Sequence, residues 1–140
     1  MRPEVFLDVA DELAHLGGPG HLRSAVSRAY YAVFHVASDA SAALGAPRAN
    51  SHDVIGDRFQ TSDDPEISEI GQRFLDLKAA RHRADYRLSQ SQGVEDSSSV
   101  MVHLREARDL VGMFGELPTG ALKEAATRAI LTYEGWSRGR

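Results

Sequence analysis

The sequence contains no cysteine, which excludes both a disulfide framework and a zinc site built from thiolates. It also lacks any uninterrupted apolar run approaching the roughly 20 residues that a membrane-spanning helix needs. Positive charge is not in excess: the formal net charge of −4 at pH 7 argues against a protein that coats nucleic acid through its overall charge. The amino-terminal residues are acidic and amphipathic, unlike the basic and then apolar start of a signal peptide. We therefore expect a cytoplasmic protein.

Sustained alternation of apolar and polar residues, the pattern of a β-strand, is missing as well. What is present is an apolar residue at every third or fourth position, which is typical of amphipathic helices. With 140 residues, 42% of them hydrophobic, the chain has the size of one domain. We predict an all-α, up-and-down bundle of about five or six helices. Its core would cover residues 5–115, followed by a C-terminal helix over 118–136 and a frayed tail at 137–140.

The most informative segment is LRSAVSRAYYAVFH, residues 22–35, the first half of a helix that we predict to run to about Leu44. One face of this helix is apolar. The opposite face lacks the usual coat of Lys and Glu and carries instead Ser24, Ser27, Arg28, Tyr31, Phe34 and His35. Arg28 and His35 are about two helical turns apart and point the same way, with Tyr31 between them. We expect this face to contact a partner or to line a cleft.

A second long helix, predicted over residues 66–89, has two charged residues on its apolar side. That side consists of Ile67, Ile70, Phe74, Leu77 and Leu88. At about 100° per residue, Arg81 falls between Ile70 and Phe74, and Asp85 falls one turn further on. Buried charges are costly unless they are paired, which leaves two interpretations open. Either the pair is a bridge that fixes the helix register, or Arg81 lines a polar pocket or a subunit seam, where a planar guanidinium suits phosphate recognition.

Together, residues 22–35 and the segment LKAARHRADY at 77–86, with His52 opening a short helix between them, resemble the HEPN superfamily. The similar members are small stand-alone proteins with an R-S-x-x-x-R-x-Y-Y-A-x-F-H helix and a later R-x-x-A-D-Y motif. The resemblance covers roughly residues 5–115. It implies a helical bundle that forms a homodimer through the faces carrying the motifs. It also implies a metal-independent endoribonuclease or toxin, often encoded beside a minimal nucleotidyltransferase that neutralises it.

In such a family site, an Arg steadies the scissile phosphate while a His activates the ribose 2′-OH or protonates the leaving oxygen. By this resemblance Arg81 is the phosphate contact, supported by Asp85. The sequence departs from the family five residues after Arg81, where Tyr86 stands in place of the expected His. A tyrosine, with a pKa of about 10, is a poor proton shuttle at neutral pH. His35 or His52 would then supply the imidazole.

These interpretations define the candidate site. The predicted catalytic residues are Arg81, Asp85, Tyr86 and His35. The predicted binding residues are Arg23, Arg28, Tyr31, His52 and His82. No cofactor is expected, and no metal, because His82 and Asp85 share a helix face without a third convergent ligand. In some family members the partner nucleotidyltransferase modifies a tyrosine beside the motif, and Tyr86 matches that residue here.

Three hypotheses stay open at this point. The first is a toxin-like RNA-binding or RNA-cleaving half of a two-protein module with a minimal nucleotidyltransferase. The second is a non-catalytic helical dimer that binds a partner protein or a nucleotide in its polar groove, which Tyr86 and the acidic composition favour. A scaffold in which Arg81 and Asp85 set the register of a dimer is the third reading.

Overall fold

The computed structural model describes residues 1–47 and 52–138. Six α-helices account for most of these residues: α1 (Val5–Leu16), α2 (Pro19–Ala43), α3 (His52–Gln60), α4 (Pro65–Tyr86), α5 (Ser97–Glu116) and α6 (Lys123–Arg138). No strand occurs in the described ranges, so the predicted all-α bundle is confirmed. None of the helices in these ranges combines the length and apolarity required to span a membrane.

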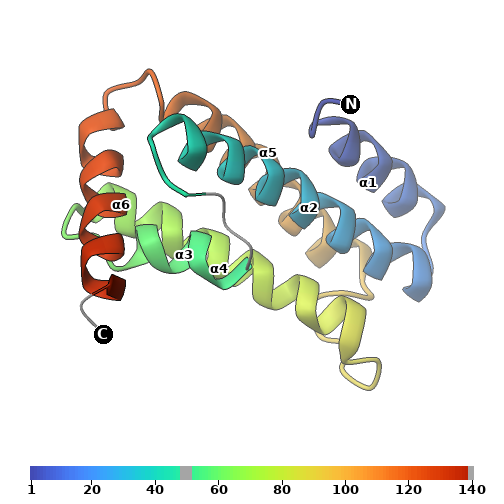
Figure 1. The fold of residues 1–140 in the computed structure, drawn as a ribbon. Coiled ribbons are helices and arrows are strands. Elements are labelled where there is room, and N and C mark those ends of the chain that lie inside the picture. Colours follow the sequence, from blue (N-terminus) through green and yellow to red (C-terminus); the bar gives the residue numbers. More distant parts are fainter. Residues whose placement is uncertain (48–51, 139–140) are drawn as a thin grey trace.

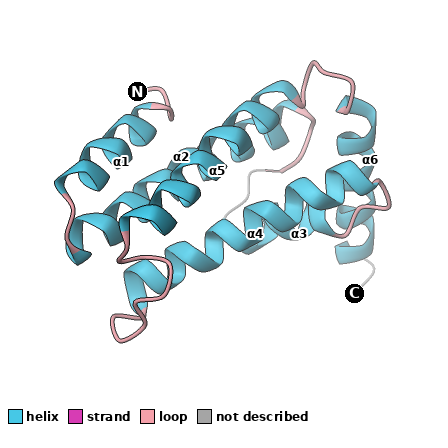
Figure 2. Cartoon of the chain, turned by 180° about the vertical axis from the view of Figure 1, so that it is seen from behind, coloured by secondary structure: helices cyan, strands magenta, loops and turns pink. Residues whose placement is uncertain are grey.

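Helix α2 lies at the centre of the bundle and packs against α1, α5 and α4 (Figure 1). Viewed from behind, α1, α2 and α5 run side by side, while α4 lies along them with α3 at one end (Figure 2). Helix α6 stands across that end and contacts α3 and α4. The long helices α2 and α4, which carry the two sequence motifs, are therefore direct neighbours.

The starts of the helices follow from local chemistry. Asp64 caps α4, because its Oδ1 accepts hydrogen bonds from two backbone N–H groups of the first turn, and Pro65 occupies the first helical position. Asp96 caps α5 in the same way through one backbone N–H. Between α1 and α2, Gly17 and Gly18 adopt φ values of 69° and 82°, which side chains disfavour. This glycine pair lets the chain reverse its direction in a short turn.

The core is built around α2, which is buried on most of its circumference. Its fully buried residues are mostly small, and these are Ala25, Val26, Ala29, Ala32, Val33 and Ala37. Small side chains let the neighbouring helices approach closely at the packing density of protein interiors. Larger side chains from α3, α4 and α5 fill the remaining space, and the ring of Phe114 contacts those of Phe59 and Phe74.

Three predictions about helix bounds differ from the structure. Helix α4 ends at Tyr86 rather than at residue 89, and Leu88, predicted on the apolar side of α4, lies beyond its end and is 74% exposed. Helix α6 begins at Lys123 rather than at 118, because residues 117–122 form turns. It continues to Arg138, so the predicted frayed tail is helical at 137–138, and the rest of it lies outside the described residues.

Candidate functional site

Arg81 lies on the side of α4 that packs against α2, and aromatic rings surround its guanidinium. Its Nη2 donates a hydrogen bond to Tyr31 Oη at 2.8 Å, and its Nε lies 2.9 Å from Asp85 Oδ2. The central guanidinium carbon lies 5.3–5.6 Å from the ring centroids of Tyr30, Tyr31 and Tyr86. The side chain of Arg81 is 14% exposed. Arg81 is therefore a partly buried cation held between α2 and α4 by a phenol, a carboxylate and three rings.

The pair of Arg81 and Asp85 is a bridge between helices as well as within one. Asp85 Oδ2 also accepts a hydrogen bond from Ser27 Oγ of α2 at 3.0 Å, so one carboxylate oxygen serves both helices. Arg81 Nε is close to that oxygen but is not aligned for a hydrogen bond. Arg81 Nη1 makes no hydrogen bond within the described residues. The guanidinium thus fixes the packing of α4 on α2 and still keeps donor capacity for a ligand.

The charge of Arg81 is secure at all physiological pH values. Burial by itself lowers the pKa of Arg81, but the neighbouring Tyr31 and Asp85 outweigh this effect and raise the pKa above its ordinary value. A guanidinium that cannot lose its proton acts as an electrostatic and hydrogen-bonding group rather than as a general acid or base.

His52, at the start of α3, forms a pair with a buried tyrosine of α2. Its Nδ1 lies 2.7 Å from Tyr30 Oη, and its ring stacks on Phe34 with centroids 3.9 Å apart. Burial, followed by the positive charges of Arg81 and Lys78, lowers the pKa of His52. Burial also raises the pKa of Tyr30, so the phenol keeps its proton. The result is a neutral imidazole, oriented by a phenol, within the electrostatic reach of Arg81.

Tyr31 connects this pair to the more exposed face of α2. Its ring centroid lies 6.1 Å from that of His52 and 6.5 Å from that of His35, and its hydroxyl accepts the hydrogen bond from Arg81. His35 is exposed and stacks on Phe6 of α1, with centroids 5.9 Å apart. Tyr31 is therefore the residue on which the predicted imidazoles and the predicted phosphate contact converge.

Arg28 completes the cluster on the side of α1. Its guanidinium carbon lies 4.7 Å from the ring centroid of Tyr31 and 5.7 Å from that of Phe6. Phe6 and Tyr30 were not predicted as site residues, because their periodicity marks both only as core-facing positions. The ring contacts that give them a role come from other helices, which a single helical pattern does not contain.

Tyr86 and His82 lie on the outer side of Arg81. Tyr86, which takes the place of the expected catalytic His, is 62% exposed at the last residue of α4. Its ring centroid lies 5.2 Å from that of the exposed His82. We refer to the residues described so far as the Arg81 cluster: Phe6, Arg28, Tyr30, Tyr31, His35, His52, Arg81, His82, Asp85 and Tyr86.

Arg23, predicted to bind a ligand, lies at the C-terminal end of α4 instead. It is 7% exposed, and its Nε donates to Glu95 Oε1 at 2.8 Å. Its two other nitrogens donate to five backbone carbonyls of residues 83–90. Because all three nitrogens donate hydrogen bonds inside the protein, Arg23 satisfies the carbonyls at the end of α4 and is not part of the Arg81 cluster.

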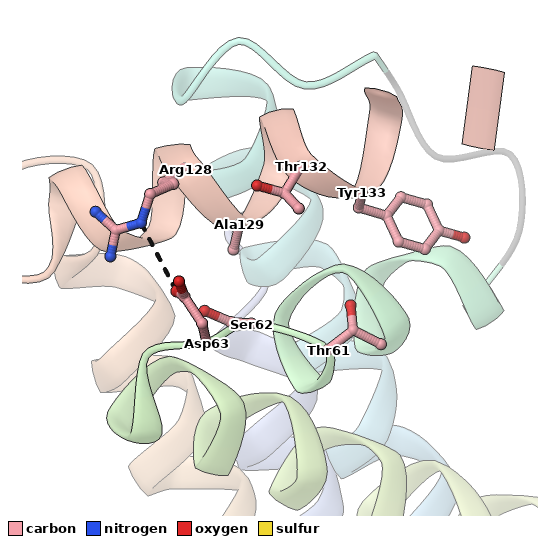
Figure 3. A pocket seen from close by; sticks show the side chains of 7 residues that line it. All are labelled: Thr61, Ser62, Asp63, Arg128, Ala129, Thr132 and Tyr133. Carbon is pink, nitrogen blue, oxygen red and sulfur yellow. Dashed lines mark ion pairs between the residues drawn. The ribbon is translucent and has the colours of Figure 1, made fainter. Parts of the chain in front are cut away.

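A separate cavity of about 320 Å³ lies between the turn after α3 and helix α6 (Figure 3). Its lining residues are Thr61, Ser62, Asp63, Arg128, Ala129, Thr132 and Tyr133. The only charged contact drawn across it is loose, with Arg128 Nε 3.7 Å from Asp63 Oδ1 and both side chains more than half exposed. Exposed pairs of this kind contribute little free energy. None of the predicted site residues lines this cavity.

No three His, Cys, Asp or Glu side chains gather as a metal site in the part of the chain that the structure describes. Comparisons with protein-family models, with curated proteins and with solved structures returned no match. The fold and the cluster therefore define the class directly: an all-α domain of six helices with a partly buried, aromatic-enclosed arginine between its two motif helices.

Proposed function

We propose that this chain is a HEPN-type protein that binds RNA through the Arg81 cluster, as the toxin-like half of a two-protein module with a minimal nucleotidyltransferase. The observation that carries the proposal is the Arg81 guanidinium, which Tyr31 holds at 2.8 Å between α2 and α4. The two motifs that resemble the family lie on these same two helices. Motif residues far apart in the sequence thus contribute to one cluster.

The chemistry of the cluster suits a phosphodiester chain. A guanidinium presents donors in a planar fork that matches phosphate oxygens, and Nη1 of Arg81 has no partner in the described residues. The exposed ring of Tyr86 beside it offers a face on which a base can stack. This local arrangement supports RNA binding in a protein whose net charge of −4 gives no general attraction to nucleic acid.

Cleavage would use the imidazoles of the same cluster. In metal-independent RNA cleavage the ribose 2′-oxygen bonds to phosphorus and the bond from phosphorus to the 5′-oxygen breaks, while a base accepts the 2′-OH proton and an acid protonates the leaving oxygen. We assign the base to His52, because it is neutral and already oriented by Tyr30 at 2.7 Å. In the tautomer that carries its proton on Nδ1, the ring of His52 donates to Tyr30 Oη, and the unprotonated Nε2 is then free to accept the proton. The exposed His35 would serve as the acid.

A non-catalytic helical dimer that binds a partner protein or a nucleotide is the second candidate. Tyr86 is the observation that favours it, because a protonated phenol occupies the place of the family's catalytic imidazole. Under this reading the Arg81 cluster keeps its phosphate contact, and no bond of the ligand is broken.

The test combines RNA binding by fluorescence anisotropy with RNA cleavage and with growth of cells that express the protein alone. Arg81→Ala is expected to weaken binding at least about tenfold, which is the loss of one charge-assisted phosphate contact, and to relieve growth inhibition. Arg81→Lys keeps the charge and serves as the folding check. Arg128→Ala, which removes an exposed arginine outside the cluster, is the matched control and should bind as wild type does.

The outcomes separate the two candidates. Separate His52→Asn and His35→Asn variants that lose cleavage but keep RNA affinity support the nuclease. RNA binding that depends on Arg81, without cleavage by wild type, selects the non-catalytic reading. Wild-type protein that neither binds RNA nor inhibits growth overturns the proposal.

A further inference from the structure

Arg83, two residues beyond Arg81 on α4, carries a charge that nothing in the described chain neutralises by direct contact. Its side chain forms no ion pair and donates no hydrogen bond within the described residues, although it is half-buried. Its Nε is buried without an acceptor. By contrast, Arg73 and Arg81 on the same helix both have carboxylate partners. A half-buried guanidinium without a carboxylate favours an anion from outside the chain.

Arg83 lines two open grooves on the outer face of α4. The first, of about 520 Å³, also has Lys78, His82 and Arg87 in its lining. The second, of about 510 Å³, lies between the end of α4 and the start of α5. No acidic side chain lines either groove, in a sequence that contains 20 Asp and Glu residues. Lys78 is paired with Asp53, so Arg83 and Arg87 are the cations left without a carboxylate contact in these linings.

The second groove places an imidazole beside Arg83. A side-chain carbon built on Gly93 would lie 3.6 Å from His103 Nε2 and 4.0 Å from Arg83 Nη2, so these two groups converge on one point. Burial and then the charge of Arg83 lower the pKa of His103. The positive charge of Arg83 therefore acts on the imidazole of His103.

Tyr86 and His82 join these grooves to the Arg81 cluster. The ring centroid of Tyr86 lies 5.4 Å from the guanidinium carbon of Arg81 and 5.2 Å from the ring centroid of His82, which lines the first groove. Tyr86 and His82 are both exposed. An unbroken strip thus leads from a phosphate-binding guanidinium, over two exposed rings, to a groove lined by further cations.

We propose that this strip is a track for single-stranded RNA. One phosphate contacts Arg81, the adjoining bases stack on Tyr86 and His82, and further phosphates lie along Arg83 and Arg87. Stacking on exposed rings needs unpaired bases, since the bases of a duplex already stack on one another. The inference rests on the proposed function and adds to it that the RNA is single-stranded and extends along the outer face of α4.

The experiment measures the affinity of full-length protein for oligonucleotides of about 4 and about 12 nucleotides, and for a duplex of the longer one, over a range of salt. Arg83→Gln and Arg87→Gln should each weaken binding of the longer single strand about five- to tenfold. Each should also reduce the slope of log affinity against log salt concentration by the contribution of about one phosphate contact. The short oligonucleotide, held at Arg81, should be bound almost as tightly as by wild type. Arg105→Gln is the matched control, because Arg105 is an exposed cation of α5 that lines neither groove.

Arg83→Lys keeps the charge and should restore most of the affinity. Unfolding curves of the Arg83 variants that match the wild-type curve would show that the loss of affinity in Arg83→Gln does not come from a structural role of Arg83. The track is overturned if Arg83→Gln and Arg87→Gln bind the long oligonucleotide as tightly as wild type does while Arg81→Ala does not. That result would leave the proposed function standing. Equal affinity for single strand and duplex also overturns the track. If wild type binds no RNA at all, both proposals fail.

Discussion

Replacing Arg23 by alanine should destabilise the fold strongly while leaving the Arg81 cluster unchanged. The substitution removes an ion pair with Glu95 at 2.8 Å and frees five backbone carbonyls at the end of α4. Arg23 itself is only 7% exposed, whereas the carboxylate of Glu95 is 29% exposed and can regain water. Most of the cost therefore comes from the carbonyls, which lose a charge-assisted donor in a partly buried place.

Each carbonyl that stays shielded from water without a donor costs about 1–3 kcal/mol, so we expect a total loss of about 3–5 kcal/mol in the free energy of unfolding. For a chain of this length each kcal/mol lowers the melting temperature by about 3 °C, so Arg23→Ala should melt about 10–15 °C lower. That is a large share of the 5–15 kcal/mol that typical domains possess.

The assay is urea denaturation followed by circular dichroism, with Arg28→Ala as the control. Arg28 lies on the same helix and has no carboxylate contact within the described residues, so its removal loses only its contacts with the rings of Phe6 and Tyr31 and should cost about 1 kcal/mol. At a temperature well below its melting point, Arg23→Ala should still bind RNA with an affinity within about twofold of wild type. An Arg23→Ala protein as stable as Arg28→Ala, or a folded one that has lost RNA, would refute the structural role.

Three further outcomes follow from the contacts described. Tyr31→Phe removes the oxygen that accepts from Arg81 and should cost about 1.5–3 kcal/mol in urea denaturation. Asp64→Ala removes the cap of α4 and should cost about 1 kcal/mol in the same assay. Both His52 and His103 have pKa values lowered by burial, so below about pH 6.5 the unfolded chain binds more protons than the folded one, and stability should fall as the pH decreases toward 5. Asn variants of the two histidines should flatten this pH dependence; an unchanged slope would contradict the assignment.

Helical periodicity was sufficient to predict the bundle, because the apolar faces of α2 and α5 are properties of single helices. The same spacing predicted that Arg81 and Asp85 lie within the apolar face of α4, and both are half-buried in the structure. The partners of these residues could not be predicted. Ser27 meets Asp85 only because α2 packs against α4, and no local pattern encodes that contact.

Arg23 is a second residue whose role depends on a contact between helices that no local pattern encodes. In the sequence it is one more basic residue beside a polar helix face, and nothing nearby indicates that the end of α4 lies next to it. The carbonyls that it satisfies belong to residues 83–90, about 60 positions away along the chain. The hydrogen bonds from Arg23 to these carbonyls thus account both for the end of α4 and for the burial of Arg23, and the sequence pattern predicted neither.

The two candidate functions of the Arg81 cluster, RNA cleavage and non-catalytic binding, differ most in what they require at Tyr86. The tyrosine found there in place of a histidine affects ligand binding as well as catalysis. A histidine there would place an imidazole within reach of the phosphate that we propose Arg81 to bind. The phenol instead sets a broad, exposed ring between Arg81 and the groove lined by Arg83. A larger aromatic face strengthens base stacking while it removes a proton shuttle at neutral pH. The departure that weakens the case for cleavage by the family's own residue therefore strengthens the case for holding single-stranded RNA at this point.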